Sequence, residues 1–274
     1  MNIKFKADLD RLFFINFSGY FAFRDDFSDS FFHYMTKLQK ITIENEYFCL
    51  NQFDSAYLSK PNLKSRIKLY NIYNRASFIL SLIPGVCAFS LCNSLALKTF
   101  HDNSDVDIFV ILDHKSFFTT RLLIILIFNI LRLRPKVCLS FFLSNKHLDL
   151  KNISLDNDIY LSHWLNSLNF VSSSADLIEN FNSVNSCSSN LVKTFRFKSM
   201  PSFLENILSS YQLKRARKKQ SQLANSYGVV IDRHMLKFHH RDIRKSFNPQ
   251  YLLQYDEFSQ GNRVKTYQQS QPLE

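Results

Sequence analysis

The chain reads Phe89-Ser90-Leu91-Cys92-Asn93-Ser94-Leu95-Ala96 and then, ten residues after Ser94, Ser104-Asp105-Val106-Asp107-Ile108-Phe109-Val110-Ile111-Leu112. An apolar run ends in a small polar turn, and two aspartates open a second apolar run. Side chains i and i+2 of a strand share a face, so we expect Asp105 and Asp107 to point the same way. Two adjacent carboxylates repel each other unless a divalent cation lies between them. The pattern therefore indicates a metal site suited to phosphoryl or nucleotidyl transfer.

The segments around this pair alternate between strand and helix patterns. A long basic amphipathic helix is expected over 61–83, where Pro84-Gly85 ends it. The expected elements that follow are a strand at 86–91, a short helix after Asn93-Ser94, a strand to Leu112, a helix over 116–133 and a strand at 137–143. This order predicts a mixed α/β core.

Four regions are predicted along the chain. Residues 1–60 are expected to form a helical N-terminal region, and 61–150 a core with a small mixed sheet. Residues 151–258 are expected to be mainly helical, and 259–274, rich in Gln, to be a disordered tail.

Composition describes a folded globular protein with a basic surface. Hydrophobic residues make up 46% of the chain, charged residues 21%, and the net charge is +11. The charge favours a polyanionic partner, which could be a nucleotide, a nucleic acid or an anionic membrane surface, although AT-rich coding would itself raise the lysine content. Nucleic acid is supported by little beyond the basic cluster at 214–219, which a charged helix side explains better.

The cysteines and apolar runs bear on the cellular compartment. Five widely spaced cysteines without a CxxC pair favour a reducing compartment over a disulfide framework or a zinc site. The longest apolar run, 122–131, is interrupted by Asn129 and is far short of the roughly 20 residues that span a bilayer. Charged residues break up any secretory pattern at the N-terminus. We therefore expect a cytoplasmic protein without a membrane span.

This part of the chain resembles the nucleotidyltransferase superfamily, which has the DNA polymerase beta-like fold. The resemblance lies in the order of its segments: a strand, an Asn-Ser turn, a short loop and Ser-Asp-x-Asp on the next strand. The resemblance implies a small mixed sheet of nucleotidyltransferase type flanked by helical regions. It also implies that Asn93 and Ser94 hold the triphosphate of an NTP substrate. Asp105 and Asp107 would be the catalytic pair that binds Mg²⁺ or Mn²⁺.

Two departures from the superfamily pattern affect this expectation. Asn93 stands where glycine is usual, and asparagine is the next-best residue for a left-handed backbone. The superfamily also has a third carboxylate on a later strand, whereas Lys136–Leu143 contains no acid and Asp113 and Asp149 are poor substitutes. Cys138, on this strand, is expected to be a small core residue. Catalysis without a protein base and a catalytically inactive nucleotide-binding or interaction module both remain open.

Later segments resemble a bacterial group of nucleotidyltransferase-like proteins: 136–143, 158–164 with Trp164, 229–231 and 235–244. Trp164 is expected to belong to a packing stripe. A set of five residues is either a phosphate- or substrate-binding edge or the solvated basic face of a helix: Lys237, His239, Arg241, Asp242 and Arg244. The resemblance implies transfer of an NMP group from an NTP to an unidentified hydroxyl or phosphate acceptor.

Overall fold

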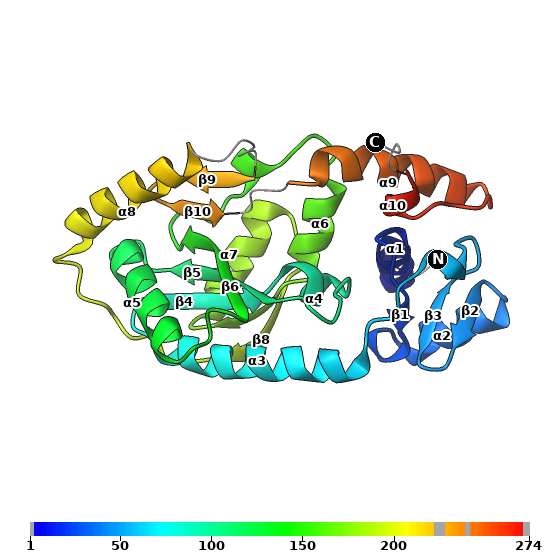
Figure 1. Ribbon diagram of the computed structural model, residues 1–274, viewed down its shortest axis with the longest axis horizontal. Helices are drawn as coiled ribbons and strands as arrows, with labels where there is room; N and C mark the ends of the chain where they lie inside the picture. Colours follow the sequence, from blue (N-terminus) through cyan, green and yellow to red (C-terminus); the bar gives the residue numbers. More distant parts are fainter. Residues whose placement is uncertain (1–2, 222–227, 239–241, 271–274) are drawn as a thin grey trace.

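The computed structural model describes residues 3–221, 228–238 and 242–270 (Figure 1). A seven-stranded mixed sheet in the order β8-β7-β4-β5-β6-β10-β9 forms the centre of its larger part. The strands are β4 (Val86–Leu91), β5 (Val106–Leu112), β6 (Val137–Ser144), β7 (Asn169–Ser172), β8 (Asn190–Thr194), β9 (Val229–Ile231) and β10 (Met235–Phe238). The mixed α/β class expected from the sequence is confirmed.

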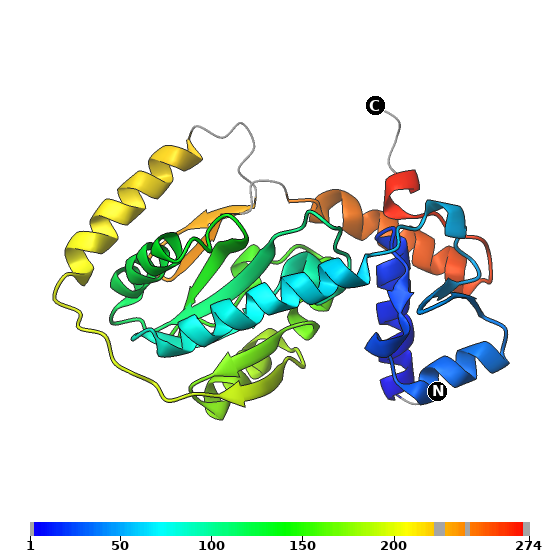
Figure 2. The same cartoon turned by 60° about the horizontal axis from the view of Figure 1, so that its bottom comes forward.

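The inner strands are covered on both faces. β4 pairs antiparallel with β5, β5 pairs parallel with β6, and every residue of β4 and β5 is buried. The surrounding helices are α3 (Leu63–Leu82), α4 (Asn93–Leu97), α5 (Phe117–Ile130), α6 (Ile159–Asn166), α7 (Ala175–Asn185) and α8 (Glu205–Gln220). α3 and α5 lie on one face (Figures 1 and 2). On the other, Trp164 of α6 and Phe181 of α7 pack against Phe109 of β5.

Gly85 makes the tight turn between α3 and β4, and its replacement gives a first prediction. Its φ is +81°, and a Cβ there would lie 2.0 Å from Thr120 Oγ1 and 2.9 Å from Ser116 Oγ of the α5 segment. Backbone strain and overpacking together should lower the free energy of unfolding of Gly85→Ala by about 2–4 kcal/mol. Gly261 has the same φ with open space around it, so Gly261→Ala reports the strain alone. Equal losses in urea titrations of the two variants would contradict the predicted clash.

The N-terminal region is not purely helical, contrary to expectation. Its elements are α1 (Ile3–Phe17), β1 (Ala22–Phe23), α2 (Asp29–Lys37), β2 (Ile41–Glu44) and β3 (Tyr47–Leu50). The strands form a separate sheet in the order β1-β3-β2. Asn45, with φ of +58°, turns the chain between β2 and β3, because asparagine tolerates the left-handed conformation that a tight hairpin needs. The long helix α3 joins this region to the central sheet (Figure 1).

The C-terminal part also departs from expectation, because β7, β8 and β10 join the central sheet beside the short strand β9, which the apolar run at 228–231 indicates. The last two helices are α9 (Arg244–Ser259) and α10 (Tyr267–Ser270). α9 packs on α1, where the rings of Tyr251 and Phe13 lie 5.1 Å apart. The predicted disordered tail is wrong for 259–270, since Val264 bridges to Phe53 and Tyr267 packs 5.1 Å from Phe247. Both contacts join residues that are far apart in the sequence, so the glutamine-rich composition of 259–274 does not indicate them. Residues 271–274 lie outside the described part.

The helices of the described part are short or largely polar. In the described ranges, none of them combines the length and the apolar character that crossing a bilayer requires. The most apolar helix, α5, has 14 residues. Its apolar side chains include Ile124 and Phe128, which are buried.

Candidate metal and nucleotide site

Two carboxylates and a thiol meet where β5 and β6 begin. Asp105 directly precedes β5, Asp107 is its second residue, and Cys138 is the partner of Asp107 on the parallel strand β6. One ligand atom from each of the three residues lies within 4.8 Å of the other two. The predicted proximity of Asp105 and Asp107 is confirmed. The prediction that Cys138 is only a core residue is wrong, because the register of β6 points its Sγ toward the carboxylates.

The buried carboxylate carries an unfavourable charge. Asp107 is only 8% exposed, whereas Asp105 is exposed. Burial, followed by the charge of Asp105, raises the pKa of Asp107 to about 6, and hydrogen bonds with Cys138 and Asn93 oppose the rise. Across the described ranges, no basic side chain forms an ion pair with Asp105 or Asp107. A bound cation would remove this penalty.

Asn93 and Ser94 lie directly beside the acidic pair. Asn93 has φ of +54°, so the left-handed backbone expected at this position is confirmed. Its side-chain amide is held between two groups: Trp164 Nε1 donates to Asn93 Oδ1 over 2.9 Å, and Asn93 hydrogen-bonds Asp107. Asn93 and Ser94 line the same pocket as Asp107. The turn is thus fixed by α6 rather than by local sequence alone.

Trp164 therefore has a role beyond the packing stripe that its spacing predicts. Its ring stacks on Phe141 with centroids 5.8 Å apart, while its N–H orients the Asn93 amide. No local pattern indicates this contact, because the two residues are 71 positions apart. Only the packing of α6 over β5 and β6 brings them together.

Trp164→Phe keeps the ring packing and removes the hydrogen bond to Asn93. For the NTP that the superfamily resemblance implies as ligand, we expect binding to be about fivefold weaker, the effect of one neutral hydrogen bond of roughly 1 kcal/mol. Asn93→Gly keeps the left-handed backbone and removes the amide, so it should weaken binding similarly. Because Trp164 acts through Asn93, the double variant should be no weaker than the poorer single variant. Equilibrium dialysis of labelled NTP measures this, and additive losses would contradict it.

A pocket of about 240 Å³ extends from Asp107 and the Asn93-Ser94 turn to Asp242 and Ile243, which precede α9. Its apolar wall comes from Phe141, Ile153 and α6, and its far side carries Lys237, Asp242 and Arg244. The site thus draws on strands and loops from both halves of the chain. The domain boundary predicted at residue 150 runs through it.

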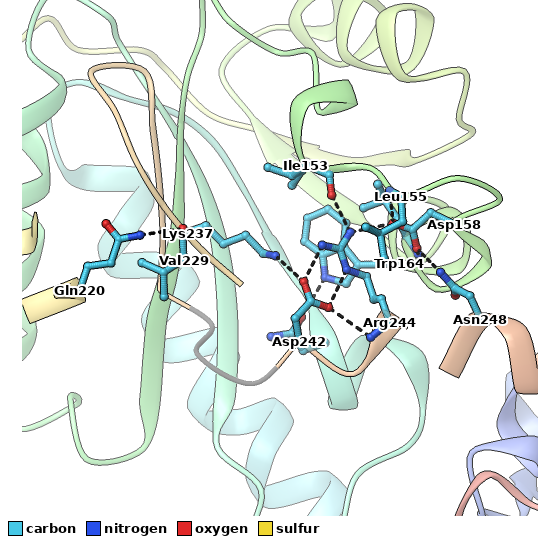
Figure 3. Close-up of polar contacts among 12 residues, drawn as sticks. Ile153, Leu155, Asp158, Trp164, Gln220, Val229, Lys237, Asp242, Arg244 and Asn248 are labelled. Carbon is cyan, nitrogen blue, oxygen red and sulfur yellow. Dashed lines mark hydrogen bonds and ion pairs between the residues drawn. The ribbon is translucent and has the colours of Figure 1, made fainter. Parts of the chain in front are cut away.

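The far side of the pocket is an ordered charge network rather than a solvated helix face (Figure 3). Arg244 donates from Nε and Nη2 to the carboxylate of Asp242 over 2.8 and 2.6 Å. Its Nη1 donates to Asp158 Oδ2 over 2.7 Å and to the carbonyl of Ile153 over 2.8 Å. The interpretation as a solvated face is therefore wrong for Arg244, whose side chain is 9% exposed. His239 and Arg241 lie outside the described residues.

Lys237 projects from strand β10 into this network. Its Nζ lies 3.8 Å from Asp242 Oδ2, and its side chain is 12% exposed. Burial, followed by the charge of Arg244, lowers the pKa of Lys237 to about 8, although Asp242 and Asp158 raise it. The ammonium group is thus a poorly hydrated cation that lines the same pocket as Asp107.

The other acids considered from the sequence lie elsewhere. Asp113 contacts His114 Nδ1 over 3.1 Å at the opposite end of β5, and Asp149 lies 4.0 Å from Lys151. Neither lines the pocket or belongs to the cluster around Asp107. The third donor in the cluster is the thiol of Cys138, on the strand where the superfamily resemblance leads us to expect a carboxylate.

Comparison with known proteins identifies no relative. No protein-family model matches the chain, and no curated protein or solved structure matches it. The interpretation of this site accordingly depends on its own geometry: the donor cluster, the left-handed turn beside it and the charged pocket that they share.

Proposed function

We propose that this chain is a metal-dependent nucleotidyltransferase that moves an NMP group from an NTP to a hydroxyl or phosphate acceptor. One observation carries the proposal: Asp105 and Asp107 lie beside the Asn93-Ser94 turn, at the ends of two neighbouring strands. Carboxylates at this place suit a divalent cation, and a left-handed turn exposes backbone to phosphate. The order of elements from α3 to β6 agrees with the superfamily resemblance seen in the sequence.

The donor set fits a divalent cation. Two carboxylates lacking basic partners in the described part of the chain, one of them buried, are costly without a positive charge between them. When bound, the cation would neutralise phosphate charge and bring the α-phosphate and the acceptor oxygen into line. Asp105 and Asp107 would hold it, and the Asn93 amide would keep Asp107 in one orientation.

The remaining pocket residues divide between the polar and apolar parts of an NTP. Lys237, with a pKa of about 8, is mostly protonated at neutral pH and would bind a phosphate oxygen. Phe141, Ile153 and Leu161 form an apolar wall for the nucleoside. Arg244 is already committed to Asp158 and Asp242, so we assign it to shaping the pocket rather than to binding phosphate.

A nucleotide-binding module without catalysis is the second candidate. The observation that favours it is the thiol of Cys138 at the place of a third carboxylate, because a thiol provides no carboxylate base for the acceptor hydroxyl. The two candidates agree on nucleotide binding and differ only on transfer.

Trp164, the only tryptophan, reports on the pocket directly. We expect its fluorescence to change when an NTP is added together with Mg²⁺, Mn²⁺ or Zn²⁺, and less with NTP alone. Transfer of label from α-phosphate-labelled NTPs to acceptors in a cell extract then separates enzyme from module. Metal-dependent binding without transfer would select the module, and the absence of metal-dependent binding by the folded protein would reject both.

A further inference from the structure

We propose that Cys138 is a thiolate ligand of the metal, and that the site therefore selects a thiophilic divalent cation of the zinc class over Mg²⁺. The inference rests on the proposed function only for the metal between Asp105 and Asp107. It concerns which cation this chain binds, and the geometry of β5 and β6 carries it.

The thiol is already directed at the metal position. Cys138 and Asp107 are register partners on adjacent parallel strands, and their side chains hydrogen-bond. Two ligands of a tetrahedral zinc ion, with Zn–S near 2.3 Å and Zn–O near 2.1 Å, lie roughly 3.6 Å apart. The three donor atoms, now within 4.8 Å of one another, need only a small contraction. Asp105 is exposed and can turn its side chain to provide it.

The buried charge gives a second, independent reason for a cation here. Asp107 is 8% exposed and faces the pocket, and within the described ranges no basic residue forms an ion pair with it. The site thus supplies two carboxylates and a sulfur without a counter-charge of its own. A divalent cation that accepts both oxygen and sulfur satisfies all three.

Ligand chemistry decides which cation is preferred. Mg²⁺ is a hard ion that binds oxygen in an octahedral shell and retains several waters. Thiolate donors favour zinc-class ions, and among first-row divalent ions affinity rises from Mn²⁺ to Cu²⁺ and falls again at Zn²⁺. Binding would release the thiol proton of Cys138 to solvent, so the thiolate and two carboxylates would carry three negative charges against the two positive charges of the ion.

Cys138 is distinct from the other cysteines. Cys49, Cys87 and Cys92 are buried, and burial raises the pKa of each thiol. Cys187 is half-buried like Cys138, but its Sγ donates to Asn182 Oδ1 over 3.2 Å, and it is not in the donor cluster. Cys187→Ser is therefore a matched control for Cys138→Ser.

The test is a metal titration of the full-length, reduced, metal-free protein. Co²⁺ and Cd²⁺ are added to wild type, Cys138→Ser and Cys187→Ser, and the ultraviolet thiolate-to-metal charge-transfer band is recorded. We expect the band in wild type and Cys187→Ser and its loss in Cys138→Ser. Equilibrium dialysis should show the preference for Zn²⁺ over Mg²⁺ falling by about 100-fold or more in Cys138→Asp, since losing even an outer-sphere partner costs roughly 10–100-fold.

The outcomes separate this inference from the proposed function. Metal binding that lacks a charge-transfer band, or equal affinity of wild type for Mg²⁺ and Zn²⁺, would overturn the role of Cys138 and leave the carboxylate site standing. A wild-type protein that is folded by circular dichroism and binds no divalent cation would overturn both. A band that survives in Cys138→Ser would place the sulfur ligand elsewhere and overturn the inference.

Discussion

Asp107→Asn should reduce metal-dependent transfer of label from an α-labelled NTP by about 10³-fold or more while leaving the protein folded. The carboxylate supplies both charge and a coordinating oxygen, and an amide supplies only a weaker oxygen, so the loss is the roughly 4 kcal/mol or more that a metal contributes to a phosphoryl transition state. Initial rates with saturating NTP in Mg²⁺, Mn²⁺ and Zn²⁺ measure it. A variant retaining more than a tenth of wild-type activity in the preferred metal would contradict the assignment of Asp107.

Asp113→Asn is the matched control for this experiment. Asp113 follows the same strand, and its side chain is also mostly buried. In the described part of the chain its ion-pair partner is His114. Asp113 lies at the end of β5 remote from the pocket. We expect its transfer rate to stay within about twofold of wild type, as for a change that does not touch the reacting groups.

Asp107→Asn should also stabilise the metal-free protein. Burial raises the pKa of Asp107 from 3.8 to about 6, so the folded state holds a proton that the unfolded state has lost between these values. The contribution of Asp107 to stability therefore rises as the pH falls from about 6 to 4, whereas Asp107→Asn lacks this step. At pH 8 we expect the variant to be more stable by roughly 2–3 kcal/mol, and at pH 4 to be no more stable. Urea titrations at both pH values, with a chelator present, measure the difference.

The parts of the site that sequence could predict are those fixed by local rules. Alternation along a strand placed Asp105 and Asp107 together, and the conformational preference of asparagine anticipated the left-handed backbone at Asn93. The bounds of β4 followed from a continuous apolar run between Gly85 and the polar turn. Each of these depends on residues a few positions apart.

The parts that could not be predicted depend on strand register and on long-range contacts. Cys138 is a candidate ligand only because the register of β6 against β5 places it directly opposite Asp107. The sequence of an apolar strand does not reveal that register. Trp164 reaches Asn93 only through the docking of α6. Lys237 resembles part of a basic helix in sequence, yet β10 pairs with β6 and carries it to the pocket.

One missed feature did have a local signal. Residues 41–50 form the β2–β3 hairpin, and the sequence Ile41-Thr42-Ile43 before Asn45 is typical of a strand entering a tight turn. The surrounding phenylalanines, which suit helix and strand alike, favoured the helical interpretation of 1–60. Aromatic-rich composition weakens periodicity as a guide, because both faces of an element are then apolar.

Arg244→Met should lower the free energy of unfolding by about 3–5 kcal/mol, the usual cost of removing one partner from a buried ion pair. The guanidinium makes four hydrogen bonds, to both oxygens of Asp242, to Asp158 and to the Ile153 carbonyl. Its removal leaves Asp158, 3% exposed, without its cation, and Asp242, 9% exposed, with only Lys237 at 3.8 Å. Urea titration followed by circular dichroism measures the loss. Lys151→Met, which removes an exposed lysine lying 4.0 Å from Asp149, should change stability by less than about 0.5 kcal/mol.

The pH dependence identifies the network as the source of this loss. Burial raises the pKa of Asp242, but the hydrogen bonds and charge of Arg244, with the charge of Lys237, outweigh it and lower the pKa to about 2. A carboxyl with a lowered pKa stabilises the fold above its unfolded pKa of 3.8 and loses that contribution as the pH falls toward 2. The difference between wild type and Arg244→Met should therefore be constant from about pH 7 to 5, below the pKa of Lys237, and shrink below about pH 4. In the double variant Arg244→Met/Asp242→Asn, removing one orphaned charge should restore part of the stability, whereas strictly additive losses would show that the two side chains are not coupled.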